Sequence, residues 1–206
     1  AAASTVAMLA IANTLKTWDV AALTAPFVLV AWLLLISATA FSGLDGSGLP
    51  RSVLVVPIDA AVANPMHADD FLQGTLKSIS QVFLKGNGIS AVLLLVGLAV
   101  SSVAAAIFAF AGALVAVIVA HVLGAESELV TGGLLGFSPV LTAIALGTVF
   151  YKPDTRVVAY ALLGTVFTVI VQGAMSVGLM PFGLPTLTGP FVLATWLFLL
   201  ARPRLT

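Results

Sequence analysis

Leu184-Pro185-Thr186-Leu187-Thr188-Gly189-Pro190-Phe191 interrupts a long uncharged region with two prolines, a glycine and two threonines. A degraded copy, Val20-Ala21-Ala22-Leu23-Thr24-Ala25-Pro26-Phe27, stands 188 − 24 = 164 positions earlier. The likeness continues as Val-Leu and then as Trp-Leu, at Trp32 and Trp196. Segments rich in Leu and Val resemble one another by chance, but threonine, proline and tryptophan matching in phase indicate an internal repeat.

The composition is typical of a membrane protein. The 206 residues are 61% hydrophobic and only 8% charged, whereas a soluble domain has about 25% charged residues. Eight basic and eight acidic residues balance, so the chain offers no basic surface for nucleic acid. It contains no cysteine, which excludes disulfides and thiolate chemistry, and we expect neither a metal nor another cofactor.

Long runs without Asp, Glu, Lys or Arg locate the membrane-embedded parts, because a helix needs about 20 apolar residues to cross a bilayer. The runs are 20–44, 86–125, 129–151 and 157–201. The second holds two spans with a bend at Ser101-Ser102, and the last holds two spans divided at Gly183-Leu184-Pro185. Strands of a membrane barrel would alternate apolar and polar residues, which these runs do not, so the sequence predicts an all-α integral membrane protein.

The repeat divides the chain into three parts. Residues 1–41 are the C-terminal end of a first repeat, in which Thr24 caps a helix that has Pro26 in its first turn. Residues 42–70 contain many Gly, Pro, Asn and Asp residues and form a linker. Residues 71–206 hold the whole second repeat.

Residues 71–85 look like a helix that enters the membrane from one side. The segment is too short and too polar to span, yet too apolar for an ordinary loop. Gly86-Asn87-Gly88 is a strong signal for the end of a helix. An amphipathic helix on the membrane surface is the alternative.

A second half-spanning helix is expected near 138–151, after the glycine-rich stretch 132–136. Ser138 caps this helix in our prediction, and Pro139 takes its first position. Interrupted helices are tolerated at membrane depth where they line a cavity, and their presence at matching places points to a substrate site near the midplane. Close packing between helices is the alternative explanation of the glycines.

Three of these segments resemble signatures of the urea transporter family. Residues 184–191 match the pattern L-P-x-x-T-x-P-F at every fixed position, and residues 80–84 resemble the first pore-helix motif. Residues 133–141 resemble the glycine-rich motif G-L-x-G-[FY]-N-x-V-L, with Ser138 in place of the usual asparagine. The copy at 20–27 departs from the signature, since Val and Ala replace its first Leu and Pro.

The resemblance, which is to the bacterial type of this family, implies a passive urea channel. Such proteins are inverted-repeat helical bundles with interrupted, half-spanning pore helices, and they form homotrimers. They are multi-pass proteins of the inner (plasma) membrane lipid bilayer. By motif, Gln81 lies at one pore mouth, and Thr188 with its partner Thr24 lies near the constriction. The walls of a flat slot are formed by Leu84, Phe137 and Leu141. The implied urea-binding residues are Gln81, Val82, Leu84, Phe137, Leu141, Thr188 and Thr24.

Elementary chemistry agrees with such a pore. Urea is planar and neutral, with N–H donors and one strong acceptor, and burying an unpaired amide-like group costs about 2–7 kcal/mol. A selective pore therefore supplies oxygens in uncharged form, as Gln and Thr side chains and the free carbonyls of half-helices do. Phe137 and Leu141 are four residues apart and share a helix face, and such apolar walls give ions no solvation.

Other functions stay open. An ammonia channel typically uses a buried histidine pair, but the two histidines are His67 in the linker and His121 at an expected helix end. The acidic pairs, Asp69-Asp70 and Glu126 with Glu128, flank spans, so we interpret them as solvated ends and do not expect an enzyme. A channel for a short amide and a non-conducting membrane scaffold are further alternatives.

Ordinary structural roles also stay open for the candidate residues. Gln81 could be an interfacial side chain, Thr188 a helix cap, and the Phe137–Leu141 pair plain core packing. Few basic residues flank the spans, so the charge distribution leaves the orientation in the membrane open.

The repeat arithmetic predicts that a two-walled pore needs more than these residues. The counterpart of Phe71 in a first repeat would stand 164 positions earlier, which is upstream of Ala1. We therefore expect a parent protein of about 300 residues, and no urea conduction by residues 1–206 as a monomer. Two copies in opposite orientations would be the exception.

Overall fold

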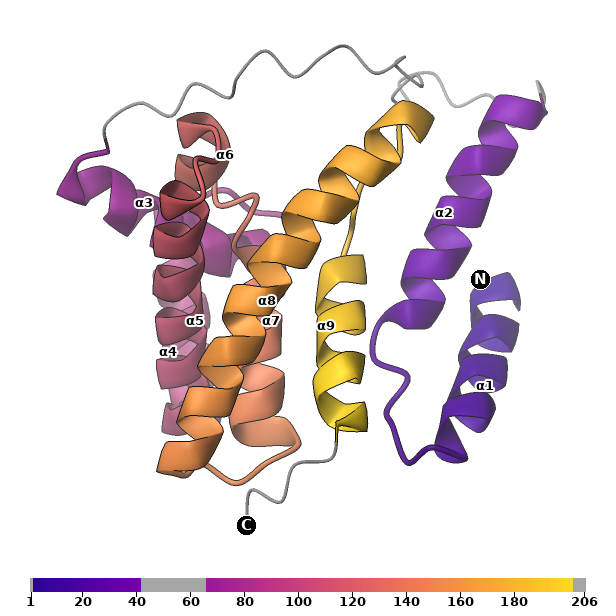
Figure 1. Cartoon of the computed structure of the whole chain (residues 1–206), viewed down its shortest axis with the longest axis horizontal. Coiled ribbons are helices and arrows are strands. Elements are labelled where there is room, and N and C mark those ends of the chain that lie inside the picture. The colour runs from indigo at the N-terminus through magenta and orange to yellow at the C-terminus, as the bar shows by residue number, and fades with distance from the viewer. Residues whose placement is uncertain (1, 42–65, 202–206) are drawn as a thin grey trace.

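The computed structural model describes residues 2–41 and 66–201, which form helices joined by turns (Figure 1). Most of the expected linker 42–70, and residues 202–206, lie outside this part. In chain order the helices are α1 (Ala2–Lys16), α2 (Ala25–Ala40), α3 (Ala68–Gln81), α4 (Gly88–Ser101), α5 (Val103–Val122), α6 (Ser127–Thr131), α7 (Phe137–Ile144) with its π-helical continuation η2 (Ala145–Val149), α8 (Thr155–Leu179) with its 3₁₀ continuation η3 (Met180–Phe182), and α9 (Gly189–Leu200).

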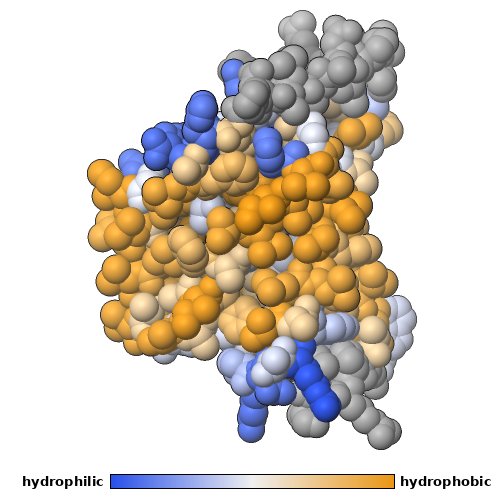
Figure 2. All heavy atoms as spheres, turned by 60° about the vertical axis from the view of Figure 1, so that its left-hand side comes forward, coloured by the Kyte–Doolittle hydropathy of each residue, from blue (hydrophilic) through white to orange (hydrophobic). Residues whose placement is uncertain are grey.

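Two of these helices are long and apolar enough to cross a membrane, namely α5 and the continuous stretch of α8 and η3. The other apolar helices, α1, α2, α4, α7 with η2, and α9, are shorter. A broad hydrophobic belt covers the visible face of the molecule, with hydrophilic side chains gathered above and below it (Figure 2). This distribution is the one expected for a protein embedded in a bilayer, and it confirms the prediction of an all-α membrane protein.

The predicted divisions of the two long apolar runs are confirmed. Helix α4 ends at Ser101, and Ser102 begins α5 by accepting a hydrogen bond from the Ala105 N–H at 3.2 Å. The second run divides after η3, where Gly183 adopts a left-handed φ of 64°. Ser102 both ends one helix and caps the next, whereas Gly183 ends η3 and α9 begins only after Thr188.

Helix α5 packs centrally, against α3, α4, α7 and α8. Its buried face consists of small residues, among them Ala109, Gly112, Ala113 and Ala116. These residues let neighbouring backbones approach closely, as in membrane helix packing generally. A side chain at Gly112 would collide with Ala143 of α7, since a Cβ built there lies 2.5 Å from the Ala143 Cβ.

The predicted bounds of the first half-spanning helix were wrong at both ends. Helix α3 starts at Ala68, inside the expected linker, because the Asp70 carboxylate accepts the His67 backbone N–H at 2.8 Å. It ends at Gln81 rather than at Lys85. The chain then turns through Leu84, whose φ is 57°, and a new helix begins after Asn87.

The second half-spanning helix, predicted to start at Pro139, also starts at a different residue. Helix α7 begins at Phe137, so Ser138 lies within its first turn, buried, and its hydroxyl has no described partner. The glycines before it allow the loop to approach α3. A Cβ on Gly136 would collide with the Ser78 side chain, and one on Gly133 with the backbone of Lys77 and Ser78. Close packing therefore accounts for both glycines.

Candidate functional site

Two helices begin near mid-height in Figure 1 and run in opposite directions from there. Helix α2 begins at Ala25 and α9 at Gly189, and each has a proline in its first turn. The preceding residues, Thr24 and Thr188, face each other, with 2.7 Å between their Oγ1 atoms. Thr24 is the N-cap residue of α2, as predicted, but its hydroxyl bonds to the other threonine and not to a helix N–H.

The turns before the two threonines share their positive-φ positions and a backbone hydrogen bond at the 164-residue offset. Leu23 and Leu187 both have a φ of 50°, and Asp19 and Gly183 have φ values of 57° and 64°. The backbone hydrogen bonds also correspond, as Val20 N–H to Leu15 O and Leu184 N–H to Leu179 O, both at 3.2 Å. The sequence repeat is thus repeated in the fold of these two turns.

Tryptophans on the two helices cross-link the turns. The Trp32 indole N–H of α2 donates to the Pro185 carbonyl at 2.8 Å. The Trp196 indole N–H of α9 donates to the Ala21 carbonyl at 2.9 Å. These two bonds are again equivalent at the offset of 164. The sequence signalled both tryptophans as part of the repeat but gave no sign of their acceptors.

Gln172 of α8 supports one of the turns. It is only 3% exposed, and its amide donates to the Thr186 hydroxyl at 2.9 Å, two residues before Thr188. One turn earlier, Thr168 donates to the Thr142 hydroxyl of α7 at 2.9 Å. Sequence reasoning missed both contacts, although Gln172, a glutamine in a charge-free run, was a usable signal for the first of them.

Gln81, which is expected at the pore mouth, and Leu84, which is expected in the slot wall, lie at the end of α3. Gln81 is half-buried, and its amide donates to the Gly132 carbonyl in the turn before α7 at 3.3 Å. Leu84 is 87% exposed in its left-handed turn. Val82 lines an apolar groove of about 370 Å³ between α3, α4 and α7, and Leu141 lines the same groove.

Leu141 connects the two parts of the predicted site. Besides bordering the groove with Val82, it packs against the cluster of Ala25, Phe191 and Val192 at the first turns of α2 and α9. Phe137, half-buried, lies one turn earlier on the same helix. The structure therefore brings together Thr24 with Thr188, and Val82 with Leu141, while Gln81 and Leu84 lie at the adjoining α3 end.

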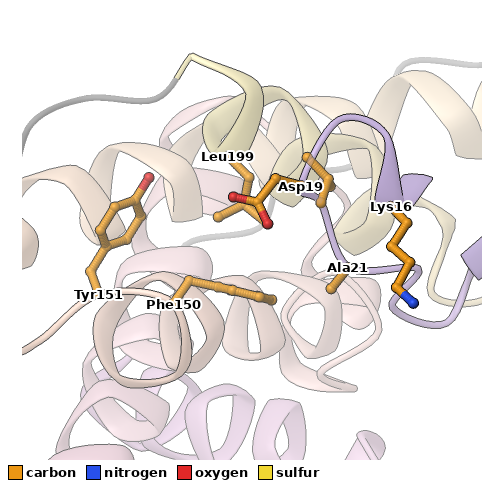
Figure 3. A pocket seen from close by; sticks show the side chains of 7 residues that line it. Lys16, Asp19, Ala21, Phe150, Tyr151 and Leu199 are labelled. Atoms are coloured by element: carbon orange, nitrogen blue, oxygen red, sulfur yellow. The ribbon is translucent and has the colours of Figure 1, made fainter.

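A larger cavity, of about 630 Å³, lies beside the α1–α2 turn and was not foreseen (Figure 3). In Figure 3 the Asp19 carboxylate and the Tyr151 hydroxyl come from different elements, the α1–α2 turn and the segment after η2. Partial burial raises the pKa of Tyr151 above its usual value, because the charged phenolate is desolvated. The residues that line this cavity are Lys16, Asp19, Val20, Ala21, Phe150, Tyr151 and Leu199.

The residues considered for other functions take ordinary positions. His121 packs edge-on against Phe71, with ring centroids 5.3 Å apart, and His67 is exposed in front of α3. Among residues 2–41 and 66–201, no three His, Asp or Glu side chains are grouped so that they could hold a metal ion.

Comparison with known proteins gives a consistent result. The family model described as "Urea transporter" matches residues 1–203. "Urea transporter 1" of Ovis aries is 30% identical over 196 residues, and that of Capra hircus is 32% identical over 199 residues. Each alignment covers 95% of this chain and 50% of the relative, so the chain spans about half the length of the curated relatives it matches.

Proposed function

The chain belongs to the urea transporter family, and from this we propose that it contributes one wall of a passive, channel-like path for urea across the cell's inner (plasma) membrane. The observation that carries the proposal is the contact of Thr24 and Thr188 at 2.7 Å, where two half-length helices begin. The protein is a transporter and not an enzyme in this proposal, and its partners are urea, the lipid bilayer and two further copies in a homotrimer.

The paired helix starts suit a neutral, strongly dipolar solute. The first N–H of each helix, at Ala25 or Gly189, already bonds to the carbonyl of Ala22 or Thr186, and a proline without an N–H follows it. The Phe27 and Phe191 N–H groups and the partial positive charge of the two helix starts are what favour the carbonyl oxygen of urea near Thr24 and Thr188. The threonine hydroxyls accept from the urea N–H groups. No Asp, Glu, Lys or Arg lies within 20–44 or 157–201, so an ion would find no counter-charge beside these threonines.

The remaining candidate residues fit a path that leads to this point. We assign Gln81 and Val82 to one mouth, where the Gln81 amide replaces part of the hydration of urea. Phe137, Leu84 and Leu141 are the flat apolar walls in this assignment, since an amide plane stacks on such surfaces while ions gain nothing there.

Unequal burial of the two equivalent helices supports the one-wall interpretation. Phe191 of α9 is 7% exposed, whereas its counterpart Phe27 of α2 is 57% exposed. Phe198 is 9% exposed and its counterpart Leu34 is 61% exposed. Helices α7 and α8 cover α9, while the corresponding face of α2 borders a groove of about 490 Å³ that includes Thr24. We propose that a helix of the α7 type fills this groove and completes the pore.

Reconstitution of the natural full-length protein in liposomes tests the function. We expect urea flux that saturates only weakly, needs no ion gradient and does not change with pH. Ammonia flux without urea flux would favour the alternative channel, and flux of neither solute would favour a scaffold. A Thr24→Val/Thr188→Val variant, matched in shape but without the hydroxyls, should lose most of the urea flux while water leak stays constant.

A further inference from the structure

The two tryptophan hydrogen bonds solve a problem that the half-length helices create. A helix that begins at mid-depth must be preceded by irregular backbone at that depth, and its carbonyls need donors. The Ala21 and Pro185 carbonyls belong to this irregular backbone, and each accepts an indole N–H. The turn before α9 receives its donor from α2, and the turn before α2 receives its donor from α9. Neither carbonyl is bonded by a tryptophan of the helix that follows it.

The same bonds constrain the threonines. Each acceptor carbonyl stands three residues before a threonine, and the intervening leucine, Leu23 or Leu187, has a left-handed φ of 50°. Such a residue has a narrow range of backbone angles, so a displacement of the carbonyl carries the threonine with it. The Trp32 ring also lies on the first turn of α9, since a Cβ on Gly189 would be 3.4 Å from its Cη2 and Cζ2 atoms.

From this geometry we infer that Trp32 and Trp196 are positioning residues that hold Thr24 and Thr188 at hydrogen-bond distance and thereby set the width of the constriction. The claim that the tryptophans set the width of the constriction rests on the proposed function. The claim that they hold the two threonines at hydrogen-bond distance is independent of it, because it concerns only the two turns. The indoles act through the backbone, and neither indole needs to touch urea.

The two turns differ in one support. Thr186 is braced by Gln172, whereas the equivalent positions in the other copy are Ala22 and Met8, which cannot form that bond. The turn before Thr24 therefore depends more on its tryptophan, which is Trp196. Loss of the Trp196 bond should separate the threonines more than loss of the Trp32 bond.

Cysteine cross-linking measures the threonine distance directly. The 206 residues contain no cysteine, so Thr24→Cys with Thr188→Cys places one thiol pair in them at the contact point. In the natural full-length protein we expect rapid disulfide formation from this pair. Adding Trp32→Phe and Trp196→Phe keeps an aromatic ring but removes both donors, and should slow cross-linking about tenfold, with Trp196→Phe the more damaging single change. Tyr160→Phe, which removes an aromatic donor to the Phe198 carbonyl of α9 away from both turns, is the matched control and should leave the rate unchanged.

A second substitution keeps the test independent of folding defects. Biosynthetic replacement of tryptophan by 3-benzothienylalanine, in a Trp18→Phe background, preserves ring shape and substitutes sulfur for the indole N–H. Cross-linking at the unmodified rate in a protein so labelled would overturn the inference, because only the hydrogen bonds would have been removed.

Selectivity tests the functional part in the protein with its threonines intact. Loosening the pair should raise the permeability of methylurea relative to urea about tenfold in the double Phe variant. This ratio does not depend on the amount of active protein, so partial misfolding leaves it unchanged. Slower cross-linking with an unchanged ratio would overturn the assignment of the constriction. Absence of urea flux in the unsubstituted protein would refute the proposed function, and the cross-linking rates would still decide the positioning role.

Discussion

The hydroxyl oxygens of Thr24 and Thr188 are in hydrogen-bond contact across 164 residues of chain, and each stands immediately before a helix. Because only one proton can lie between the two oxygens, one threonine donates and the other retains a free hydroxyl hydrogen. The pair can therefore donate to and accept from a passing solute at the same time.

Removing one hydroxyl should slow transport without unfolding the protein. We expect Thr188→Val to reduce urea permeability about tenfold, because an N–H of urea would lose an acceptor in an apolar setting. Stopped-flow light scattering of proteoliposomes measures this. Thr131→Val, at the end of α6, removes a hydroxyl that bonds its own helix and is the control. Equal urea permeability of the two variants would exclude a direct role for Thr188.

Gln81→Leu should slow urea flux while trimers still form, because the side chain at the α3 end would no longer replace hydration at the mouth. The matched control is Gln73→Leu, an exposed position on the same helix. Flux and cross-linked oligomers should be measured on the same preparation. If both variants transport urea at the unsubstituted rate, Gln81 is an interfacial side chain.

Phe137→Ala distinguishes a slot wall from a core residue. A slot wall predicts a higher permeability ratio of methylurea to urea with little change in stability. A well-packed core residue predicts a loss of about 3–5 kcal/mol in the free energy of unfolding and an unchanged ratio. Flux ratios and thermal unfolding, measured in parallel, give opposite results for the two roles.

Gly136→Ala tests the approach of the α7 loop to α3. A methyl group there would collide with Ser78, although the backbone angles suit alanine, so we expect a loss of about 1–3 kcal/mol from overpacking alone. Gly173→Ala in α8 has open space around its Cβ and should be neutral or stabilising by up to about 1 kcal/mol. Thermal unfolding in detergent compares them. A destabilisation shared by both would point to general helix effects.

The groove beside α2 that includes Thr24 predicts which introduced cysteines are protected from a thiol reagent. Phe27→Cys should react with a small membrane-permeant thiol reagent in isolated residues 1–206, and should be protected in the natural full-length protein. Leu33→Cys is the control, because both Leu33 and its counterpart Leu197 are exposed. Reaction of Phe27→Cys at equal rates in both proteins would argue against a second wall at that face, as would urea flux by monomeric residues 1–206.

The repeat and the helix divisions could be predicted because they depend on local chemistry. Ser102, Gly183 and Pro185 interrupt the apolar runs through their local chemistry. The threonine match signalled that Thr24 and Thr188 are equivalent. That these two residues touch did not follow from the offset alone, since equivalent residues of a repeat can lie far apart.

The errors arose where tertiary contacts override local signals. Ser138 has the side chain of a helix cap, but the approach of Gly136 to Ser78 lets the helix start earlier and places the serine in its first turn. Helix α3 begins early because Asp70 folds back on His67. The indole and amide bonds to loop carbonyls and hydroxyls join residues that are distant in sequence, and a pattern of types and spacings does not identify such partners.

The left-handed leucines have a consequence for synthesis. A non-glycine residue at positive φ costs about 1–3 kcal/mol, and it persists only where surrounding contacts hold it. For Leu23 those contacts include the bond between the nearby Ala21 carbonyl and Trp196, which the ribosome adds 175 residues later. The turn before α2 therefore lacks this hydrogen bond until Trp196 has been synthesised. The threonine pair forms only after Thr188 has been synthesised, 164 residues after Thr24, so the proposed constriction is assembled late.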